Sequence, residues 1–119
     1  MEIITRARCK AVVLSVEEKL HIMRDVLDLI PAAWQNDCPA VIVPKDCLPE
    51  AFFDLKTGFA GEALQKFTNY NIKIAVTGDF EGYSSKSLRD FMYESNKGRQ
   101  VFFKATVEEA LAAIEKALL

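Results

Sequence analysis

The stretch Ala-Val-Ile-Val at residues 40–43 constrains the fold more than any other part of the sequence. This run is short and wholly apolar, which favours a central strand buried on both faces over a strand with one face in water. Pro44 ends the run, because proline cannot donate a backbone hydrogen bond within a sheet. A strand of this kind needs covering elements on both sides of its sheet, so the flanking sequence should supply helices.

The sequence before this run predicts a hairpin and a helix. Residues 2–6 and 11–16 have strand patterns and are expected to pair, joined around residues 8–10. Pro31 should interrupt the helix that follows, because proline removes a backbone donor and clashes with the preceding turn. The buried stripe of this helix is expected to consist of Leu20, Met23, Val26, Leu27 and Ile30, which recur at helical spacing.

Helices and strands alternate through the rest of the chain. Pro49 is expected to open a single helical turn through Phe52, and a longer helix should run from about Gly58 to Thr68. The segment "NIKIAVTG" at 71–78 predicts a further internal strand that ends at Gly78.

The last predicted strand covers residues 100–105, and one predicted helix precedes it in the sequence and another follows it. The first has a serine cap and a glycine stop at Gly98, with Leu88, Phe91, Met92 and Ser95 on one side. The second begins with a capping box formed by Thr106 and Glu109. Its expected inward side consists of Val107, Ala110, Leu111, Ile114 and Leu118.

The predicted order is β-β-α-β-α-β-α-β-α, which indicates a single α/β domain over residues 1–119. Strands separated by helices imply right-handed crossovers, so we expect a mostly parallel mixed sheet with helices packed on it. The first strand should form a sheet edge that could support dimerisation, although Glu2 and Arg6 would blunt such an edge. The sequence leaves the oligomeric state open.

Ligands of open parallel sheets bind outside the carboxyl ends of the strands, and two predicted loops leave such ends. If their strands are neighbours, polar groups from both loops should converge on one rim. The candidate residues are Asp54, Lys56, Thr57 and Gly58 from the segment "DLKTG", together with Asp79, Ser85 and Lys86. Arg99 follows a helix and precedes a strand, so it should lie at the opposite rim.

The segment "DLKTG" is open to three interpretations. Asp54 or Thr57 could cap the following helix, with Lys56 solvated. The segment could instead form a contact surface or switch for a partner protein. It could also bind an anion or nucleotide, with Lys56 and the Thr57 hydroxyl assisting the free amides of the helix start. A Walker phosphate loop is excluded, because residues 50–55 contain no glycine.

The sequence favours a non-enzymatic role. Asp54 and Asp79 could form a sparse magnesium site, but an aspartate after a strand more often bonds nearby backbone amides. No nucleophile, base and orienting group occur at a recognisable spacing. The three cysteines (Cys9, Cys38 and Cys47) and the single histidine, His21, are expected to be structural or inert. The sequence therefore predicts no cofactor and no metal.

Charge and hydropathy limit the partners. The formal net charge is −2, and lysine and arginine are scattered along the sequence, which argues against nucleic acid or anionic membrane as the main partner. The longest apolar runs are too short to span a bilayer. The first residues have a strand pattern with an acid at Glu2 instead of a basic and apolar leader, so we expect a cytoplasmic protein.

The segments "FFDLKTGFAGEALQKFTNY", "GDF" and "SKSLRDFMYESNKGR" closely resemble a family of uncharacterised bacterial proteins, domain-of-unknown-function family 4180. This resemblance covers nearly the whole chain and implies no specific activity. The element order also resembles the STAS domain of anti-sigma-factor antagonists and anion-transporter tails. In that fold an Asp-Ser-Ser/Thr-Gly segment opens the second helix, and its first serine is phosphorylated by a partner kinase.

The STAS resemblance places "DLKTG" at the phosphorylation site but does not transfer the switch. When Thr57 and Gly58 are aligned with the end of that motif, Lys56 occupies the position of the phosphorylated serine. When Asp54 is aligned with its acid, Leu55 occupies that position, so neither alignment provides a phosphate acceptor. The sequence therefore predicts a regulatory or protein-interaction module that contacts another protein through the "DLKTG" rim. The alternative is a domain that binds a small molecule, anion or nucleotide at the same rim.

Overall fold

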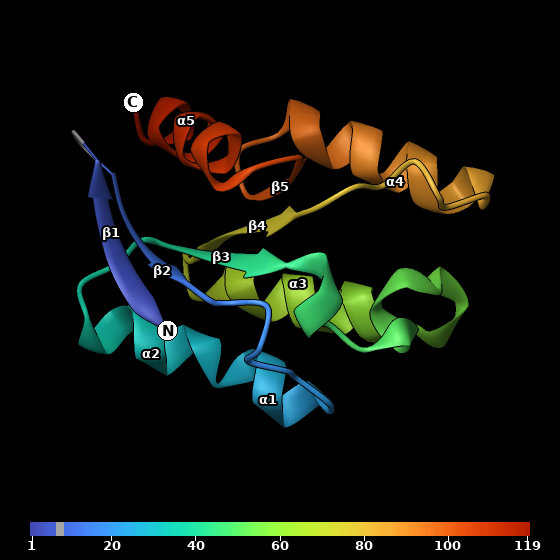
Figure 1. Ribbon diagram of the computed structural model, residues 1–119, viewed down its shortest axis with the longest axis horizontal. Coiled ribbons are helices and arrows are strands. Elements are labelled where there is room, and N and C mark those ends of the chain that lie inside the picture. The colour runs from blue at the N-terminus through green and yellow to red at the C-terminus, as the bar shows by residue number, and fades with distance from the viewer. Residues whose placement is uncertain (7–8) are drawn as a thin grey trace.

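The computed structural model describes residues 1–6 and 9–119, which form a five-stranded sheet with helices on both faces (Figure 1). The strands lie side by side in sequence order: β1 (Glu2–Arg6), β2 (Cys9–Val13), β3 (Ala40–Pro44), β4 (Lys73–Thr77) and β5 (Val101–Lys104). β1 is antiparallel to β2, and each later strand is parallel to its neighbour. The predicted α/β fold with a mostly parallel sheet is therefore confirmed.

The helices alternate with the strands as predicted. α1 (Met23–Leu27) and α2 (Leu29–Gln35) join β2 to β3, α3 (Phe59–Asn69) joins β3 to β4, α4 (Lys86–Lys97) joins β4 to β5, and α5 (Val107–Leu118) follows β5. Between β3 and α3 the chain forms 3₁₀ turns at Lys45–Cys47, Glu50–Phe53 and Leu55–Thr57. None of the helices within residues 1–6 and 9–119 combines the length and apolar character that a membrane span requires.

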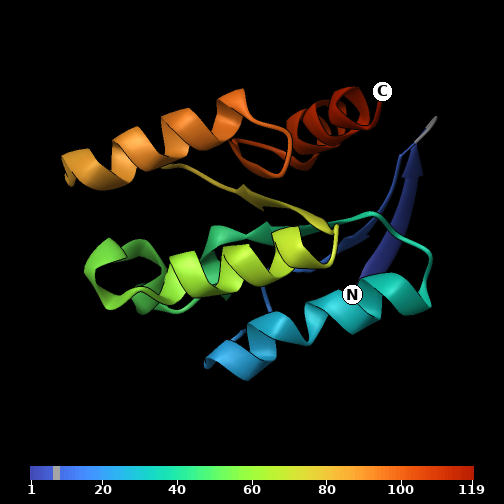
Figure 2. The same cartoon turned by 180° about the vertical axis from the view of Figure 1, so that it is seen from behind.

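Each face of the sheet has its own hydrophobic core. Val41 and Val43 point into the core formed with α1, α2, α3 and α4, whereas Ile42 points into the core formed with α5. Figures 1 and 2 show α5 on the opposite side of the sheet from α1, α2 and α3. Residues 40–43 of β3 and 74–76 of β4 are fully buried. The prediction that residues 40–43 are buried on both faces is therefore confirmed.

The hairpin and the first helix differ in detail from their predictions. β2 begins at Cys9 and ends at Val13, so it starts earlier than the predicted strand at 11–16. The predicted turn begins at residue 8, which lies outside the described residues. Leu20 precedes α1, and its amide donates to the Cys47 carbonyl at 2.8 Å instead of to a helical partner.

The helix break predicted at Pro31 lies earlier, at Asp28, between α1 and α2. Pro31 belongs to the first turn of α2, and the helix continues beyond it to Gln35. A first-turn residue has no intrahelical partner for its amide, so proline is tolerated there. The prediction that Pro31 itself interrupts the helix was therefore wrong.

The predicted inward side of the last helix is correct except at its end. Ala110, Leu111 and Ile114 are buried against the sheet, and Thr106 caps the helix by accepting the Glu109 amide at 3.2 Å. Leu118 is 38% exposed, and Ala117 is the buried residue of the last turn. The buried stripe of the helix therefore ends at Ala117, and Leu118 and Leu119 after it are exposed.

A side chain closes part of the β5 edge of the sheet, at Phe103. The Gly78 amide donates to the Lys104 carbonyl, and by strand alternation the backbone groups of Phe103 point away from β4. Asn96 of α4 bonds both of these groups: its Oδ1 accepts the Phe103 amide at 2.8 Å, and its Nδ2 donates to the Phe103 carbonyl at 3.1 Å. The Asn96 carboxamide thus replaces a neighbouring strand.

Asn96→Ala should lower the free energy of unfolding by about 1–3 kcal/mol, because it removes the partners of two backbone groups in a partly buried position. Urea unfolding would measure the loss, and amide hydrogen exchange should become faster at Phe103. Asn96→Asp keeps the acceptor for the Phe103 amide and loses the donor, so it should protect that amide better than alanine does. Equal exchange rates at Phe103 in the wild type and Asn96→Ala would contradict the edge-closing role.

Candidate functional site

The two predicted rim segments lie at the same end of the sheet. β3 and β4 are neighbours, and the turns at 45–57 follow β3 while residues 78–85 follow β4. Figure 1 shows the loop before α3 and the start of α4 at the same end of the molecule, on the right. The structure therefore brings the segments to one rim, as the strand order requires.

The polar groups of "DLKTG" bond within their own segment. The Asp54 Oδ1 accepts the Lys56 amide at 3.3 Å. The Thr57 hydroxyl lies 2.7 Å from the Ala51 carbonyl oxygen and 2.8 Å from the Asp54 carbonyl oxygen, and it accepts the Phe59 amide at 3.1 Å. Asp54 and Thr57 therefore stabilise the turn that leads into α3.

Gly58 has a structural role at the junction of this turn and α3. Its φ of 77° lies in the left-handed region, where a side chain would introduce strain. Its amide donates to the Leu55 carbonyl at 3.2 Å, and its carbonyl accepts the Glu62 amide at 3.0 Å. Lys56 is exposed and is the side chain of "DLKTG" that these contacts leave free for a ligand or partner.

The second rim segment is also held by local bonds. The Asp79 Oδ1 accepts the Glu81 amide at 3.0 Å, which forms an Asx turn after β4. Ser85 caps α4 by accepting the Leu88 amide at 3.2 Å, and the Lys86 Nζ lies 2.7 Å from Asp90 one turn along the helix. Asp79 additionally lines a groove of about 630 Å³ that includes Phe80, Glu81, Arg89 and Lys104.

Aromatic contacts, and not the predicted polar groups, join the two rim segments. The rings of Phe53 and Tyr83 stack at 5.1 Å between centroids, and Tyr83 stacks on Phe80 at 6.2 Å. The Lys45 Nζ lies 5.3 Å from the Tyr83 ring centroid, within the range of a cation–π contact. A Cβ at Gly78 would approach Lys45 side-chain atoms to 2.8 Å, so a glycine there allows this close approach.

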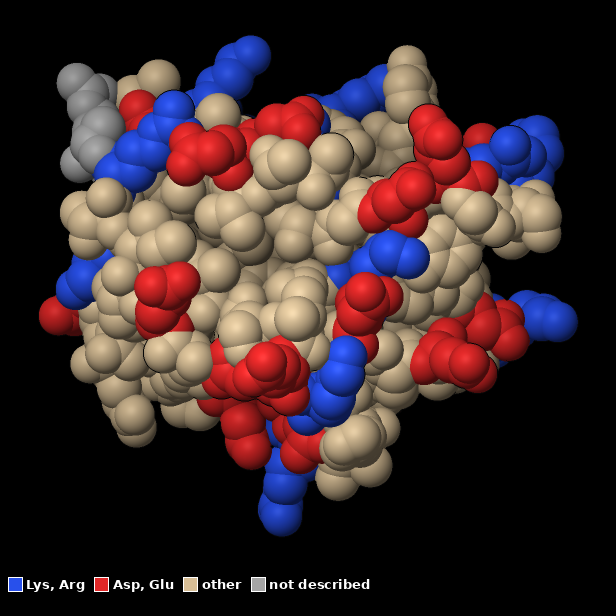
Figure 3. All heavy atoms as spheres, in the orientation of Figure 1, with Lys and Arg blue, Asp and Glu red and all other residues tan. Residues whose placement is uncertain are grey.

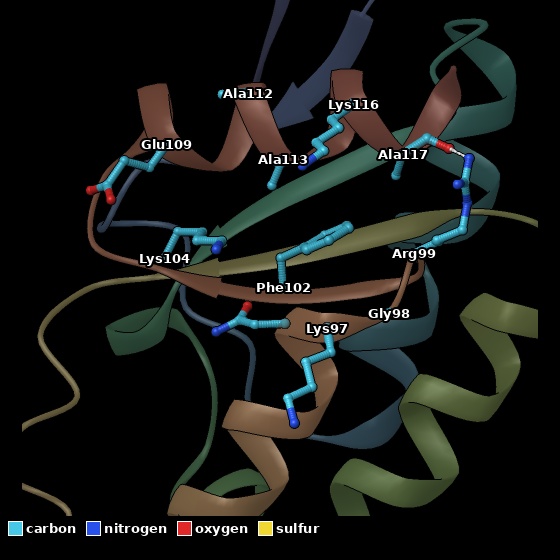
Figure 4. A pocket seen from close by; sticks show the side chains of 11 residues that line it. Lys97, Gly98, Arg99, Phe102, Lys104, Glu109, Ala112, Ala113, Lys116 and Ala117 are labelled. Carbon is cyan, nitrogen blue, oxygen red and sulfur yellow. Dashed lines mark hydrogen bonds between the residues drawn. The ribbon is translucent and has the colours of Figure 1, made fainter.

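A second candidate site lies beside β5, between α4 and α5. It is an open groove of about 520 Å³, lined by Asn96, Lys97, Gly98, Arg99, Phe102, Lys104, Glu109, Ala112, Ala113, Lys116 and Ala117 (Figure 4). The small alanine side chains of α5 leave room above Phe102. Figure 4 shows Lys104 and Lys116 directed toward this space, whereas Glu109 and Lys97 point away from it.

The groove concentrates positive charge. Within residues 1–6 and 9–119, the side chains of Arg99, Lys104 and Lys116 form no ion pair. Lys97 is engaged elsewhere, because its Nζ lies 4.4 Å from the Tyr93 ring centroid and 3.5 Å from a Glu94 oxygen. On the face shown in Figure 3, by contrast, acidic and basic side chains are interspersed.

Arg99 lies at the amino end of β5, at the rim predicted for it. Its Nη2 donates to the Ala117 carbonyl near the end of α5, which fixes one side of the guanidinium and leaves further donors free. The Lys73 Nζ donates to the Arg99 carbonyl at 2.6 Å, and burial together with the Arg99 charge lowers the pKa of Lys73. Positive charge therefore accumulates at this end of the sheet.

Sequence reasoning did not identify this groove, because its cations come from three different elements. Arg99 follows α4, Lys104 ends β5 and Lys116 lies near the end of α5. The scattered basic residues in the sequence are thus partly gathered by the fold. One feature of the sequence could have pointed to the groove. Glu109, Ala112, Ala113 and Lys116 recur at helical spacing, so they lie on one side of the last helix, next to its buried stripe.

The cysteines and the histidine lie outside these sites. Cys9, Cys38 and Cys47 are buried and unpaired, and burial raises the pKa of each thiol, which keeps it protonated. The Cys47 Sγ donates to the Ser15 carbonyl at 3.1 Å. His21 precedes α1 and is exposed, and its backbone amide donates to Asp25 at 2.8 Å.

A protein-family model described as "Domain of unknown function (DUF4180)" matches residues 6–114. The chain belongs to this family. Searches of curated proteins and of solved structures returned no match for the DUF4180 chain. The family match covers the rim and most of the groove, but Lys116 and Ala117 of the groove lining lie beyond it. The resemblance to STAS domains stays a prediction.

The role of Thr57 in this DUF4180 protein can be tested by Thr57→Val, which keeps the side-chain shape but removes the hydroxyl. The free energy of unfolding should fall by about 1–2 kcal/mol, because the bonds to two carbonyl groups and to the Phe59 amide are lost. Thr57→Ser retains the hydroxyl and should stay within about 0.5 kcal/mol of the wild type in the same urea titration. A valine variant as stable as the serine variant would show that the hydroxyl does not stabilise the turn.

Proposed function

We propose that this protein is a non-enzymatic binding module whose ligand is a small anion held in the groove between α4 and α5. The observation that carries this proposal is that three cationic side chains, none of them in an ion pair with another described residue, surround one cavity. An unpaired positive cluster on a chain of net charge −2 favours an external anion as its counter-charge.

The chemistry of the lining supports binding over catalysis. Arg99 offers a planar fork of donors that suits a phosphate or carboxylate, and Lys104 and Lys116 add point charges. The carboxylate of the lining, Glu109, accepts a bond from Thr106 at 3.3 Å. The groove volume of about 520 Å³ is within the range of small-molecule sites, which suits a nucleotide or sugar phosphate.

The rim is the second candidate and corresponds to a regulatory or protein-interaction role. Lys56 is exposed on a turn whose shape is fixed by Asp54 and Thr57, and the Phe53–Tyr83 stack ties this turn to the segment after β4. A turn with a fixed backbone and a free charge suits recognition of another protein, because little backbone ordering is needed on binding. The resemblance to STAS domains, in which the corresponding segment meets a partner kinase, supports the same surface.

A thermal-shift screen against nucleotides, sugar phosphates and simple anions tests the groove. A ligand that binds only the native state stabilises it by about 4 kcal/mol at a thousandfold excess over its dissociation constant, so a true ligand should raise the melting temperature clearly. Lys104→Ala and Lys116→Ala should each weaken binding about tenfold or more, because each removes a charge-assisted contact.

Lys56→Ala is the matched control, since it removes a lysine from the rim and leaves the groove intact. Binding that survives Lys56→Ala and weakens in both groove variants would support the groove. Binding that is lost only in Lys56→Ala would place the anion site at the rim. A screen without any stabilising anion would contradict the proposed function.

A pull-down with the wild type and Lys56→Glu tests the rim as a protein-contact surface. The charge reversal should abolish capture of a rim partner while the circular dichroism spectrum and melting temperature stay unchanged, because Lys56 is exposed. Lys66→Glu on α3 is the comparison for a non-specific effect of added negative charge. Capture of the same protein by all three forms would exclude Lys56 from the contact.

A further inference from the structure

β1 leaves one edge of the sheet open. It is the outermost strand, and Figures 1 and 2 both show it at the margin of the molecule with no described element beyond it. Its side chains are exposed except for Ile4, which is partly buried against the core under α5. This edge therefore differs from the β5 edge, where Asn96 occupies the outward groups of Phe103.

The backbone groups that point outward from β1 can be assigned from the pairing of β2. The Leu14 amide donates to the Ile42 carbonyl of β3, so by alternation Ala11 and Val13 direct their backbone groups toward β1. Their partners on β1 are Ile4 and Glu2, which therefore bond inward.

By the same alternation, Ile3 and Thr5 direct their amide and carbonyl groups away from the sheet. Within residues 1–6 and 9–119, these outward groups form no hydrogen bond. An edge strand in this state can accept another antiparallel strand through main-chain bonds.

We propose that two copies of this chain associate through β1, with the two strands antiparallel about a two-fold axis at Ile4. In this register Ile3 lies opposite Thr5 of the second copy, so both outward-facing residues exchange their amide and carbonyl bonds across the interface. Ile4 lies opposite its own copy in a non-hydrogen-bonded pair, where side chains approach closely.

The charges of β1 select this register. Antiparallel pairing about Ile4 places Glu2 opposite Arg6 of the second copy, and symmetry repeats the pair at the other end of the interface. Opposite charges in directly facing positions stabilise a strand pair. A register centred on Ile3 would instead place Glu2 opposite Ile4 and would leave Arg6 beyond the paired residues. Glu2 and Arg6 would disfavour pairing of this edge with an unrelated strand. The same two charges make the edge complementary to a second copy of itself.

The face of β1 that carries these charges also joins the core. Glu2, Ile4 and Arg6 alternate with Ile3 and Thr5, so they share one face of the strand. Ile4 packs in the core under α5, and the Arg6 Nη1 lies 2.8 Å from Glu108 at the start of α5. In the pair, Arg6 would lie between Glu108 of its own chain and Glu2 of the second copy, which forms a row of alternating charge. Meanwhile Ile3, 38% exposed in the single chain, would be covered by Thr5 of the second copy.

Analytical ultracentrifugation of the full chain over a range of concentrations tests this proposal. The wild type should show a reversible monomer–dimer equilibrium. Glu2→Arg and Arg6→Glu should each weaken association at least about tenfold, because each replaces two facing ion pairs with two like-charge pairs. The double variant Glu2→Arg/Arg6→Glu restores opposite charges and should recover association to near the wild-type level.

Glu108→Gln is the matched control for the loss of the Arg6–Glu108 pair within one chain, and it should leave the dimer in place. Thr5→Pro removes an outward amide without changing any charge and should weaken association, with circular dichroism confirming a folded chain. A wild type that stays monomeric at millimolar concentration would overturn the proposal. A folded double variant that remains as monomeric as the single variants would also overturn it, because the register would then be wrong.

Discussion

The burial of β3 and β4 on both faces is the constraint on which the rest of the structure depends. Residues 40–43 and 74–76 are fully buried, so apolar cover is required above and below the sheet. α1 to α4 provide this cover on one face, and of the described helices α5 alone provides it on the other. A single helix is narrower than the sheet, so both margins of the α5 face are less covered. The basic groove lies at one margin, and the partly buried Ile4 lies at the other.

The element order could be predicted from the sequence because it depends on local signals. Apolar runs, the serine and threonine caps, and the spacing of apolar residues are all set within a few neighbouring positions. The details that were predicted wrongly are the position of the helix break and the buried residue of the last helical turn, and both depend on geometry outside the local sequence. The helix breaks at Asp28, and Pro31 is then tolerated because it lies in the first turn of α2. In the last turn of α5, Ala117 is buried and Leu118 is exposed. Neither outcome is visible in the spacing alone.

The candidate site was predictable only in part. Strand order placed both rim segments at one end of the sheet, but Asp54, Thr57, Asp79 and Ser85 each bond within their own segment. Side chains that find partners a few residues away do not need a contact across the rim, and the aromatic rings make that contact instead. The cationic residues of the groove belong to different elements of the chain, so no local sequence pattern predicts that they lie close together.

The β1 and β5 edges of this sheet differ in how many of their outward backbone groups are free. This difference limits how many molecules can add to one another through their sheet edges. Polymerisation by edge addition requires that every incoming molecule present a fresh edge for the next one. Here Asn96 occupies the outward groups of Phe103, so strand addition at this part of the β5 edge is blocked. In the proposed pair, addition at β1 would use the β1 edge of both molecules and would give a closed two-fold arrangement instead of a fibre. One carboxamide on α4 thus makes the β5 edge a poorer acceptor of a further strand than the β1 edge.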